Sequence, residues 1–276
     1  MIWAAIIAWF CLSSTGGVHD AQYQALDKFI NNNQNAMITT LQGAIQQTDA
    51  PTTLEYTLDQ ASKMGFVVKN IDNIVGYAEY GSGSDYIAVL CHLDTPPVAP
   101  GWTVNPYGGV LADSYIFGVG AYGCKGPAYS ALWALEAIKS SNLKLNKRVR
   151  IIFGTDYGSG QYSDCAAYLQ QEAPPQFGFA ITGTYPGNYI SPTDKNLELM
   201  VTTYNTFTKN KLKPIALLPG MYALAIPNVV GFGGALANPV TPSQGRNGGV
   251  DERLDIANGY IKTAQLYARE IFELAQ

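Results

Sequence analysis

Two periodicities alternate along the chain, that of an α-helix and that of a β-strand. We predict helices where apolar residues recur at helical spacing, and strands where short runs rich in β-branched residues stand between polar ones. The Asn31–Asn35 cluster interrupts the first helical pattern, and the Pro174–Pro175 pair ends another helix. The predicted helices span about 20–47, 53–64, 125–140, 163–170 and 251–275, and the predicted strands span 66–70, 74–81, 86–90, 149–153 and 177–181.

The order of these elements predicts the fold class. Helices and strands alternate through most of the chain, which is typical of an α/β sheet with helices layered on it. A length of 276 residues with 47% hydrophobic residues is sufficient for a substantial core. We therefore expect one α/β domain over residues 20–276.

An unbroken apolar run, IWAAIIAWFCL, occupies residues 2–12 and is followed by small and polar residues. Its length is that of a signal-peptide core and is too short to span a bilayer as a helix. We expect residues 1–19 to be a signal peptide and the protein to be secreted, although the usual positive residue before the run is missing. The alternative is an apolar segment that is retained and docks on a neighbouring subunit.

The charge of the chain limits the classes of partner that it is expected to bind. Only 14% of residues are charged, below the roughly 25% of average soluble domains, and the net charge is −4. Nucleic acids and acidic membranes require basic patches, so the sequence gives no reason to expect either. A polar but weakly charged surface suits association with proteins, including further copies of this chain.

Candidate chemistry begins at the end of the predicted central strand. His92 and Asp94 follow this strand in the sequence CHLD. In open α/β sheets ligands bind at the carboxyl ends of strands, so a histidine with an aspartate two residues later suits a metal ligand and its orienting partner.

The surrounding motifs make a larger pattern. His-Leu-Asp-Thr-Pro-Pro is followed in order by Pro-Gly-Trp, Asn-Pro-Tyr, Gly-x-Gly and Lys-Gly-Pro, the last at the start of a helix. This series resembles the dinuclear zinc peptidases that include carnosinase, aminoacylase, carboxypeptidase G and dipeptidase V. Later stretches continue the resemblance: VRIIFGTDYGSG (149–160), FGFAITGTYP (177–186) and YALAIPNVVGFG (222–233).

The resemblance implies a three-layer, phosphorylase/hydrolase-like sheet flanked by helices. In that family a lid and dimerisation domain is inserted where this chain has only the short segment 187–213. We therefore expect the lid domain to be absent, and with it the family's means of closing over a substrate.

The same resemblance implies that the metal ligands have been lost. Five residues hold two zinc ions in that family, and only His92 remains here. The bridging aspartate falls at Gly123, the catalytic glutamate at Tyr157, the adjacent ligand at Gly158, the aspartate of the next strand end at Thr182, the final histidine at Gly248, and the arginine that grips the substrate carboxylate at Leu224.

A zinc site requires three or four protein ligands, and catalytic zinc also requires a base. The sequence contains two histidines, His19 and His92. We therefore expect no catalytic residue, no bound metal and no other cofactor. The predicted function is that of a secreted, inactive relative of the zinc dipeptidases that acts as a structural, self-assembling or binding protein.

Two other functions stay open. A residual metallopeptidase would use His92, Asp94 and Asp156 around a single ion. A monomeric binder of small molecules or peptides would use the old substrate cleft, lined by aromatic residues. The candidates for that lining are Tyr122, Tyr157, Tyr185 and Trp102.

Cysteines add one further possibility. Cys124 and His92 would make a nucleophile–base pair, but no oxyanion donor can be identified from the sequence. If Cys11 leaves with a signal peptide, Cys91, Cys124 and Cys165 remain, an odd number. A disulfide and buried free thiols are both compatible with this count.

Overall fold

A mixed six-stranded sheet with the order β1-β2-β6-β3-β7-β8 forms the centre of the computed structural model, which describes residues 19–181, 195–209, 221–232 and 245–276. Neighbours β6, β3, β7 and β8 run parallel, whereas β1 and β2 pair antiparallel. The strands are β1 (Val67–Ile71), β2 (Val75–Tyr80), β3 (Tyr86–His92), β4 (Val110–Ala112), β5 (Tyr115–Phe117), β6 (Arg148–Gly154), β7 (Phe177–Ala180), β8 (Val229–Gly231) and β9 (Arg253–Asp255).

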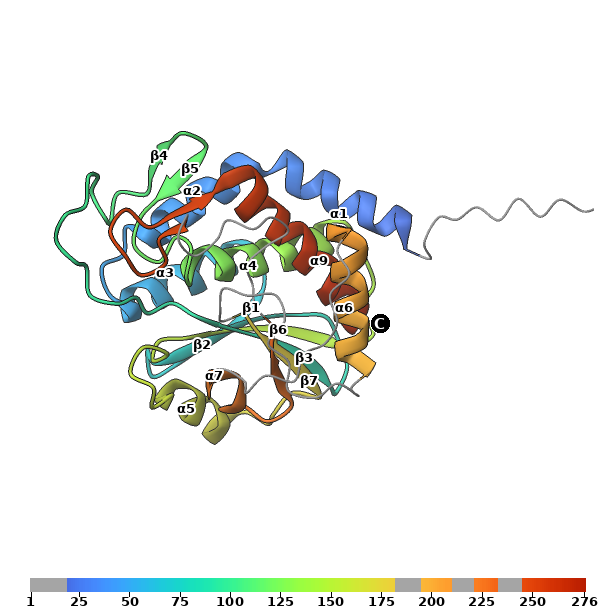
Figure 1. Cartoon of the computed structure of the whole chain (residues 1–276). Coiled ribbons are helices and arrows are strands. Elements are labelled where there is room, and N and C mark those ends of the chain that lie inside the picture. The colour runs from blue at the N-terminus through green and yellow to red at the C-terminus, as the bar shows by residue number, and fades with distance from the viewer. Residues whose placement is uncertain (1–18, 182–194, 210–220, 233–244) are drawn as a thin grey trace, which may run out of the picture.

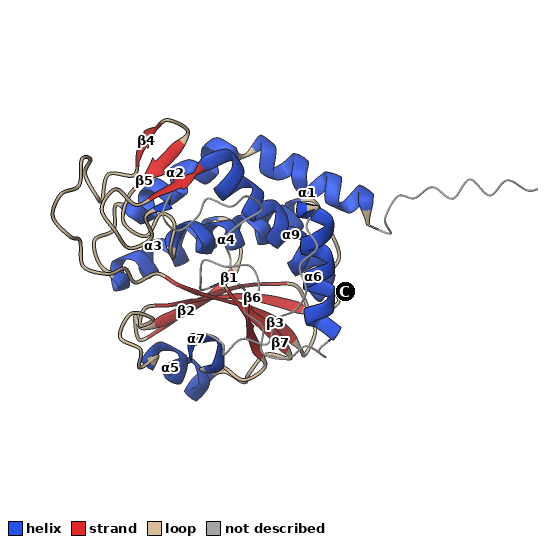
Figure 2. Ribbon diagram, in the orientation of Figure 1, coloured by secondary structure: helices blue, strands red, loops and turns tan. Residues whose placement is uncertain are grey.

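Helices cover both faces of this sheet (Figures 1 and 2). The group on one face includes α3, α4 and α9, and the other face carries α5 and α7. The helices are α1 (Asp20–Asn32), α2 (Gln34–Ile45), α3 (Ala50–Lys63), α4 (Lys125–Ser140), α5 (Ser163–Gln171), α6 (Lys195–Thr208), α7 (Met221–Leu224), the π-helix η1 (Ile256–Ile261) and α9 (Lys262–Leu274). The expected three-layer α/β class is confirmed.

The central strand β3 is apolar on both faces because helices cover both. Every residue from Tyr86 to His92 is buried. Successive side chains of a strand point to opposite faces, so Ile87 and Val89 join the core under α4 and α9, while Ala88 and Leu90 join the core under α5 and α7. The sheet therefore holds the end of β3 rigidly, and His92 stands at that end.

The end of the chain differs from its prediction. We expected one helix over 251–275, but β9 and η1 precede α9. Residues Arg253–Asp255 pair with β5, and the Asp255 side chain accepts a hydrogen bond from Asn258 N at 2.6 Å. Because residues 253–255 pair with β5, the last α-helix begins later in the chain than predicted. Strands β4, β5 and β8 and helix α6 were also not predicted.

The predicted interruption of the first helix is confirmed. Helices α1 and α2 meet at Asn33, whose side-chain amide donates to Phe29 O at 2.8 Å. This side-chain bond competes with the helical backbone pattern.

The segment expected to replace the lid domain lies partly outside the described residues. Its described part includes α6, which packs against α9. No helix in the described portion of the chain is long and apolar enough to cross a membrane.

Candidate functional site

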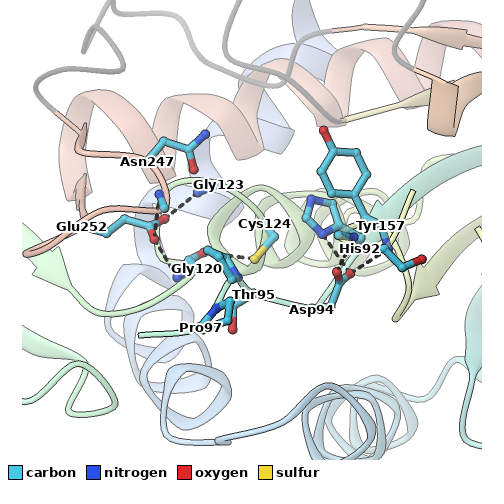
Figure 3. Close-up of a pocket in the computed structure, with 14 residues that line it drawn as sticks. His92, Asp94, Thr95, Pro97, Gly120, Gly123, Cys124, Tyr157, Asn247 and Glu252 are labelled. Atoms are coloured by element: carbon cyan, nitrogen blue, oxygen red, sulfur yellow. Dashed lines mark hydrogen bonds and ion pairs between the residues drawn. The ribbon is translucent and has the colours of Figure 1, made fainter. Parts of the chain in front are cut away.

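A cleft of about 660 Å³ opens at the carboxyl end of β3. The parallel pairing of β3 with β6 sets His92 beside Gly154, so the loop after β6 passes next to the histidine. The start of α4 and the turn before β9 form the opposite wall (Figure 3). Three separate loops thus meet at one sheet edge, as expected for ligand sites of open α/β sheets.

Asp94 connects the end of β3 to the loop after β6 through hydrogen bonds. Its carboxylate lies 3.1 Å from His92 Nδ1 and accepts backbone N–H bonds from Tyr157 at 3.2 Å and from Gly158 at 2.7 Å. Burial alone raises the pKa of a carboxyl group, but the bonds from His92 and the two amides outweigh it and the pKa of Asp94 is lowered. Asp94 is therefore a charged anchor for the loop after β6.

Aromatic rings cover the histidine. The Tyr157 ring stacks on His92 with centroids 4.1 Å apart and planes at 23°, and Tyr222 meets both rings edge-on. Tyr157 stays 37% exposed and lines the cleft, so a ligand in the cleft can reach its side chain. Burial raises the pKa of Tyr157, which keeps the phenol neutral.

Asp156 has a different role. Its carboxylate accepts the backbone N–H of Ser163 at 2.8 Å and the Ser163 hydroxyl at 2.6 Å. It therefore holds the first residue of α5. Asp94 and Asp156 thus both accept hydrogen bonds from backbone amides at the ends of loops.

Glu252 is the second carboxylate of the cleft. Four backbone amides donate to it: Gly123 at 2.8 Å, Tyr122 at 2.9 Å, Gly120 at 3.0 Å and Gly248 at 3.3 Å. Burial raises the pKa of Glu252, although these four bonds oppose the rise. The carboxylate binds the loop before α4 to the turn before β9.

The thiol of the cleft is unsuited to nucleophilic chemistry. Cys124 is buried and its Sγ faces Gly120 O at 3.7 Å. Burial, with the nearby Glu252 charge, raises the pKa of Cys124 far above its ordinary value, so the reactive thiolate is not formed. Lys125 points away to Gln47 O at 3.0 Å. Cys91, Cys124 and Cys165 are all buried free thiols. Of the two possibilities that their odd number left open, the structure has free thiols and no disulfide among these three residues.

The residues present do not fit a dinuclear zinc centre. The carboxylate oxygens of Asp94 and Glu252 accept hydrogen bonds from backbone amides. His92 is the one histidine that lines the cleft. No group of three or more His, Cys, Asp or Glu side chains suited to a metal occurs within the described ranges.

The fold brings together most of the positions that the family resemblance singled out. His92, Asp94, Gly123, Tyr157, Gly158 and Gly248 all line the cleft. Leu224 is 53% exposed on α7 and does not line it, while Thr182 and Tyr185 lie outside the described residues.

The sequence did not predict two residues that line the cleft, Glu252 and Asn247. The sequence shows Glu252 only as part of an Asp-Glu pair, because its amide donors lie about 130 residues earlier in the chain. Asn247 gives no signal in the sequence, yet its side chain occupies the space that a Cβ at Gly123 would need.

Comparison with known proteins supports the resemblance. Residues 88–210 match the model of Peptidase family M20/M25/M40. "Putative dipeptidase YtjP" of Bacillus subtilis is 40% identical over 129 residues, which cover 47% of this chain and 28% of the relative. "Putative dipeptidase SSP1012" of Staphylococcus saprophyticus is 35% identical over 48% of this chain and 28% of its own length. The chain thus matches little more than a quarter of these relatives.

Solved structures share the fold at low identity. Aminopeptidase PepT of Bacillus cereus aligns with a TM-score of 0.63 at 11% identity, covering 88% of this chain and 99% of that chain. Human carnosine dipeptidase 1 aligns with a TM-score of 0.53 at 18% identity, covering 60% of this chain and 42% of that chain. Residues 88–210 are therefore similar to a segment of the M20 peptidases, and the chain shares the α/β fold of these solved structures.

Proposed function

We propose that this chain is a catalytically inactive, dipeptidase-like protein that uses its cleft for binding and not for hydrolysis. The observation that carries the proposal is the use of the cleft carboxylates. Asp94 and Glu252 together accept six backbone N–H bonds, so a metal or a substrate proton would have to compete with these bonds for their oxygens.

A residual metallopeptidase is the main alternative, since the matched relatives are named as dipeptidases. It would need His92, Asp94 and Asp156 around one ion. Asp94 orients His92 and anchors the loop, and Asp156 holds α5 through Ser163. These contacts favour the inactive interpretation, because a carboxylate that binds an ion would have to release them.

The cleft itself favours binding. It is open, and it presents the exposed Tyr157 ring beside His92 with no lysine or arginine in its lining among the described residues. Aromatic faces bind planar or apolar groups, whereas the lack of a cation disfavours a free carboxylate. We infer that ligands of this cleft are neutral or cationic and are small molecules or peptide side chains.

Hydrolysis assays test the proposal. A panel of dipeptides is incubated with the purified chain in the presence of zinc, cobalt or manganese, beside the His92→Ala variant as the matched control. We expect the same background rate for both proteins. Hydrolysis that His92→Ala abolishes would show a working metal site and overturn the proposal.

Secretion and self-association remain part of the proposal. The apolar run at 2–12 supports secretion, and the low content of charged residues, 14%, supports contacts with proteins or with further copies. Sequencing the N-terminus of exported protein tests the first, and light scattering tests the second. An intact apolar run in exported protein, or a monomer at all concentrations, would reject the respective statement.

A further inference from the structure

The sequence contains two Asn-Gly dipeptides, Asn247–Gly248 and Asn258–Gly259. Asparagine is a thermally labile residue, and a following glycine exposes its backbone nitrogen because it has no side chain. The two sites share one dipeptide chemistry. The fold, however, places them in opposite surroundings.

Asn247–Gly248 lies in an exposed turn on the wall of the cleft. Gly248 has φ +66°, a left-handed conformation in which glycine keeps its freedom. No hydrogen bond holds the Asn247 side-chain amide among the described residues. The Gly248 N–H bond to Glu252, at 3.3 Å, is the longest of the four that this carboxylate accepts.

Asn258–Gly259 lies inside the π-helix η1. Asn258 N donates to Asp255 Oδ1 at 2.6 Å, and Gly259 O accepts from the Thr263 hydroxyl at 2.6 Å. Gly259 is buried, and a Cβ there would contact the Leu254 side chain at 2.9 Å. Attack on the Asn258 side chain therefore requires the helix to open.

We propose that Asn247 is a site of spontaneous deamidation, which adds a second carboxylate to the wall of the cleft that holds Glu252. Gly248 N attacks Asn247 Cγ, and its proton passes through solvent to Nδ2. The Cγ–Nδ2 bond breaks and ammonia leaves, which gives a succinimide. Water opens this ring to aspartate or isoaspartate, so one water is consumed for each ammonia released.

The new carboxylate lies beside Glu252. A Cβ at Gly123 would clash with Asn247 Oδ1, and Glu252 Oε1 would lie 3.6 Å from that Cβ. A negative charge on residue 247 repels the neighbouring Glu252 carboxylate, so deamidation weakens the contact that joins the turn to the loop before α4. The reaction therefore alters both the charge of the cleft and the attachment of its wall.

Peptide mapping tests the site. The folded protein is incubated at mildly alkaline pH, and the conversion of both dipeptides is followed by mass spectrometry in one sample. We expect Asn247 to convert at least roughly tenfold faster than Asn258, because reaction at Asn258 requires local opening. In denaturant we expect similar rates at both. Equal rates in the folded protein, or no conversion at Asn247, would overturn the proposal.

Matched variants test the consequence. Asn247→Asp introduces the charge without waiting for the reaction, and Asn247→Ser removes the amide without adding charge. We expect a lower melting temperature for Asn247→Asp than for Asn247→Ser at neutral pH. Equal melting temperatures would contradict the predicted crowding of Glu252.

Discussion

Glu270 is a fully buried carboxyl group on α9 whose two oxygens have no hydrogen-bond partner in the described structure. The hydroxyl of Tyr267, one turn earlier on the same helix, is also buried without a partner. Burial raises the pKa of Glu270 well above its ordinary value, so the group is kept neutral. A buried polar group of this kind costs about 1–3 kcal/mol of stability.

Replacement of this carboxyl group should stabilise the protein. We expect Glu270→Leu to raise the free energy of unfolding by about 1–3 kcal/mol, measured by denaturant unfolding. Because the folded protein holds this proton more tightly than the unfolded chain, the wild type loses stability as pH rises above the unfolded pKa near 4.5. The advantage of Glu270→Leu should therefore grow from acidic to neutral pH. An advantage that does not change with pH would contradict this account.

At the scale of elements, the loop after β6 depends on one carboxylate. Asp94 holds the amides of Tyr157 and Gly158 and orients His92. We expect Asp94→Asn to lower stability by about 1.5–3 kcal/mol, because these are hydrogen bonds to a charged group. Amide exchange at Tyr157 and Gly158 should accelerate, whereas the exposed control Asp85→Asn should leave it unchanged.

The sign of the pH dependence follows from the lowered pKa of Asp94. The folded protein releases this proton more readily than the unfolded chain, so the stabilisation is present above the ordinary value of 3.8 and is lost as pH falls through the folded value. The difference between wild type and Asp94→Asn should shrink on acidification. Unchanged amide exchange in Asp94→Asn would reject the anchoring role.

Most long elements could be predicted from local pattern, and the short ones could not. The run from Tyr86 to Leu90 predicts β3 because both of its faces are apolar. Strands β4, β5 and β9 have only three residues each, and their pairing joins segments far apart in sequence. The order of the motifs identified the positions that line the cleft. The four amides that donate to Glu252 could not be identified, because they lie on loops that only the fold brings together.

At the scale of the whole molecule, the two ends of the sheet differ in their chemistry. The cleft lies at the carboxyl end of β3, and a buried ionic cluster lies near its amino end. Arg150 binds Glu79 and Glu172, donates to the Tyr168 hydroxyl at 2.7 Å and lies 3.9 Å from the Tyr77 ring centre. This cluster connects β2, β6 and the end of α5.

Loss of the arginine should leave two partly buried carboxylates without their partner. We expect Arg150→Met to lower the free energy of unfolding by about 3–5 kcal/mol. The exposed pair of Lys63 and Asp59 gives the control, since Lys63→Met should cost at most about 1 kcal/mol. Similar losses in the two variants, measured by urea unfolding, would contradict a structural role for the cluster.

The most direct test of the inactive interpretation is the metal content of protein purified without chelator, measured by inductively coupled plasma mass spectrometry. The account predicts well under one zinc, cobalt or manganese ion per chain, and the same residual amount in the His92→Ala variant. Two ions per chain that survive dialysis and are lost in His92→Ala would contradict it, and would show that this cleft holds a working metal centre.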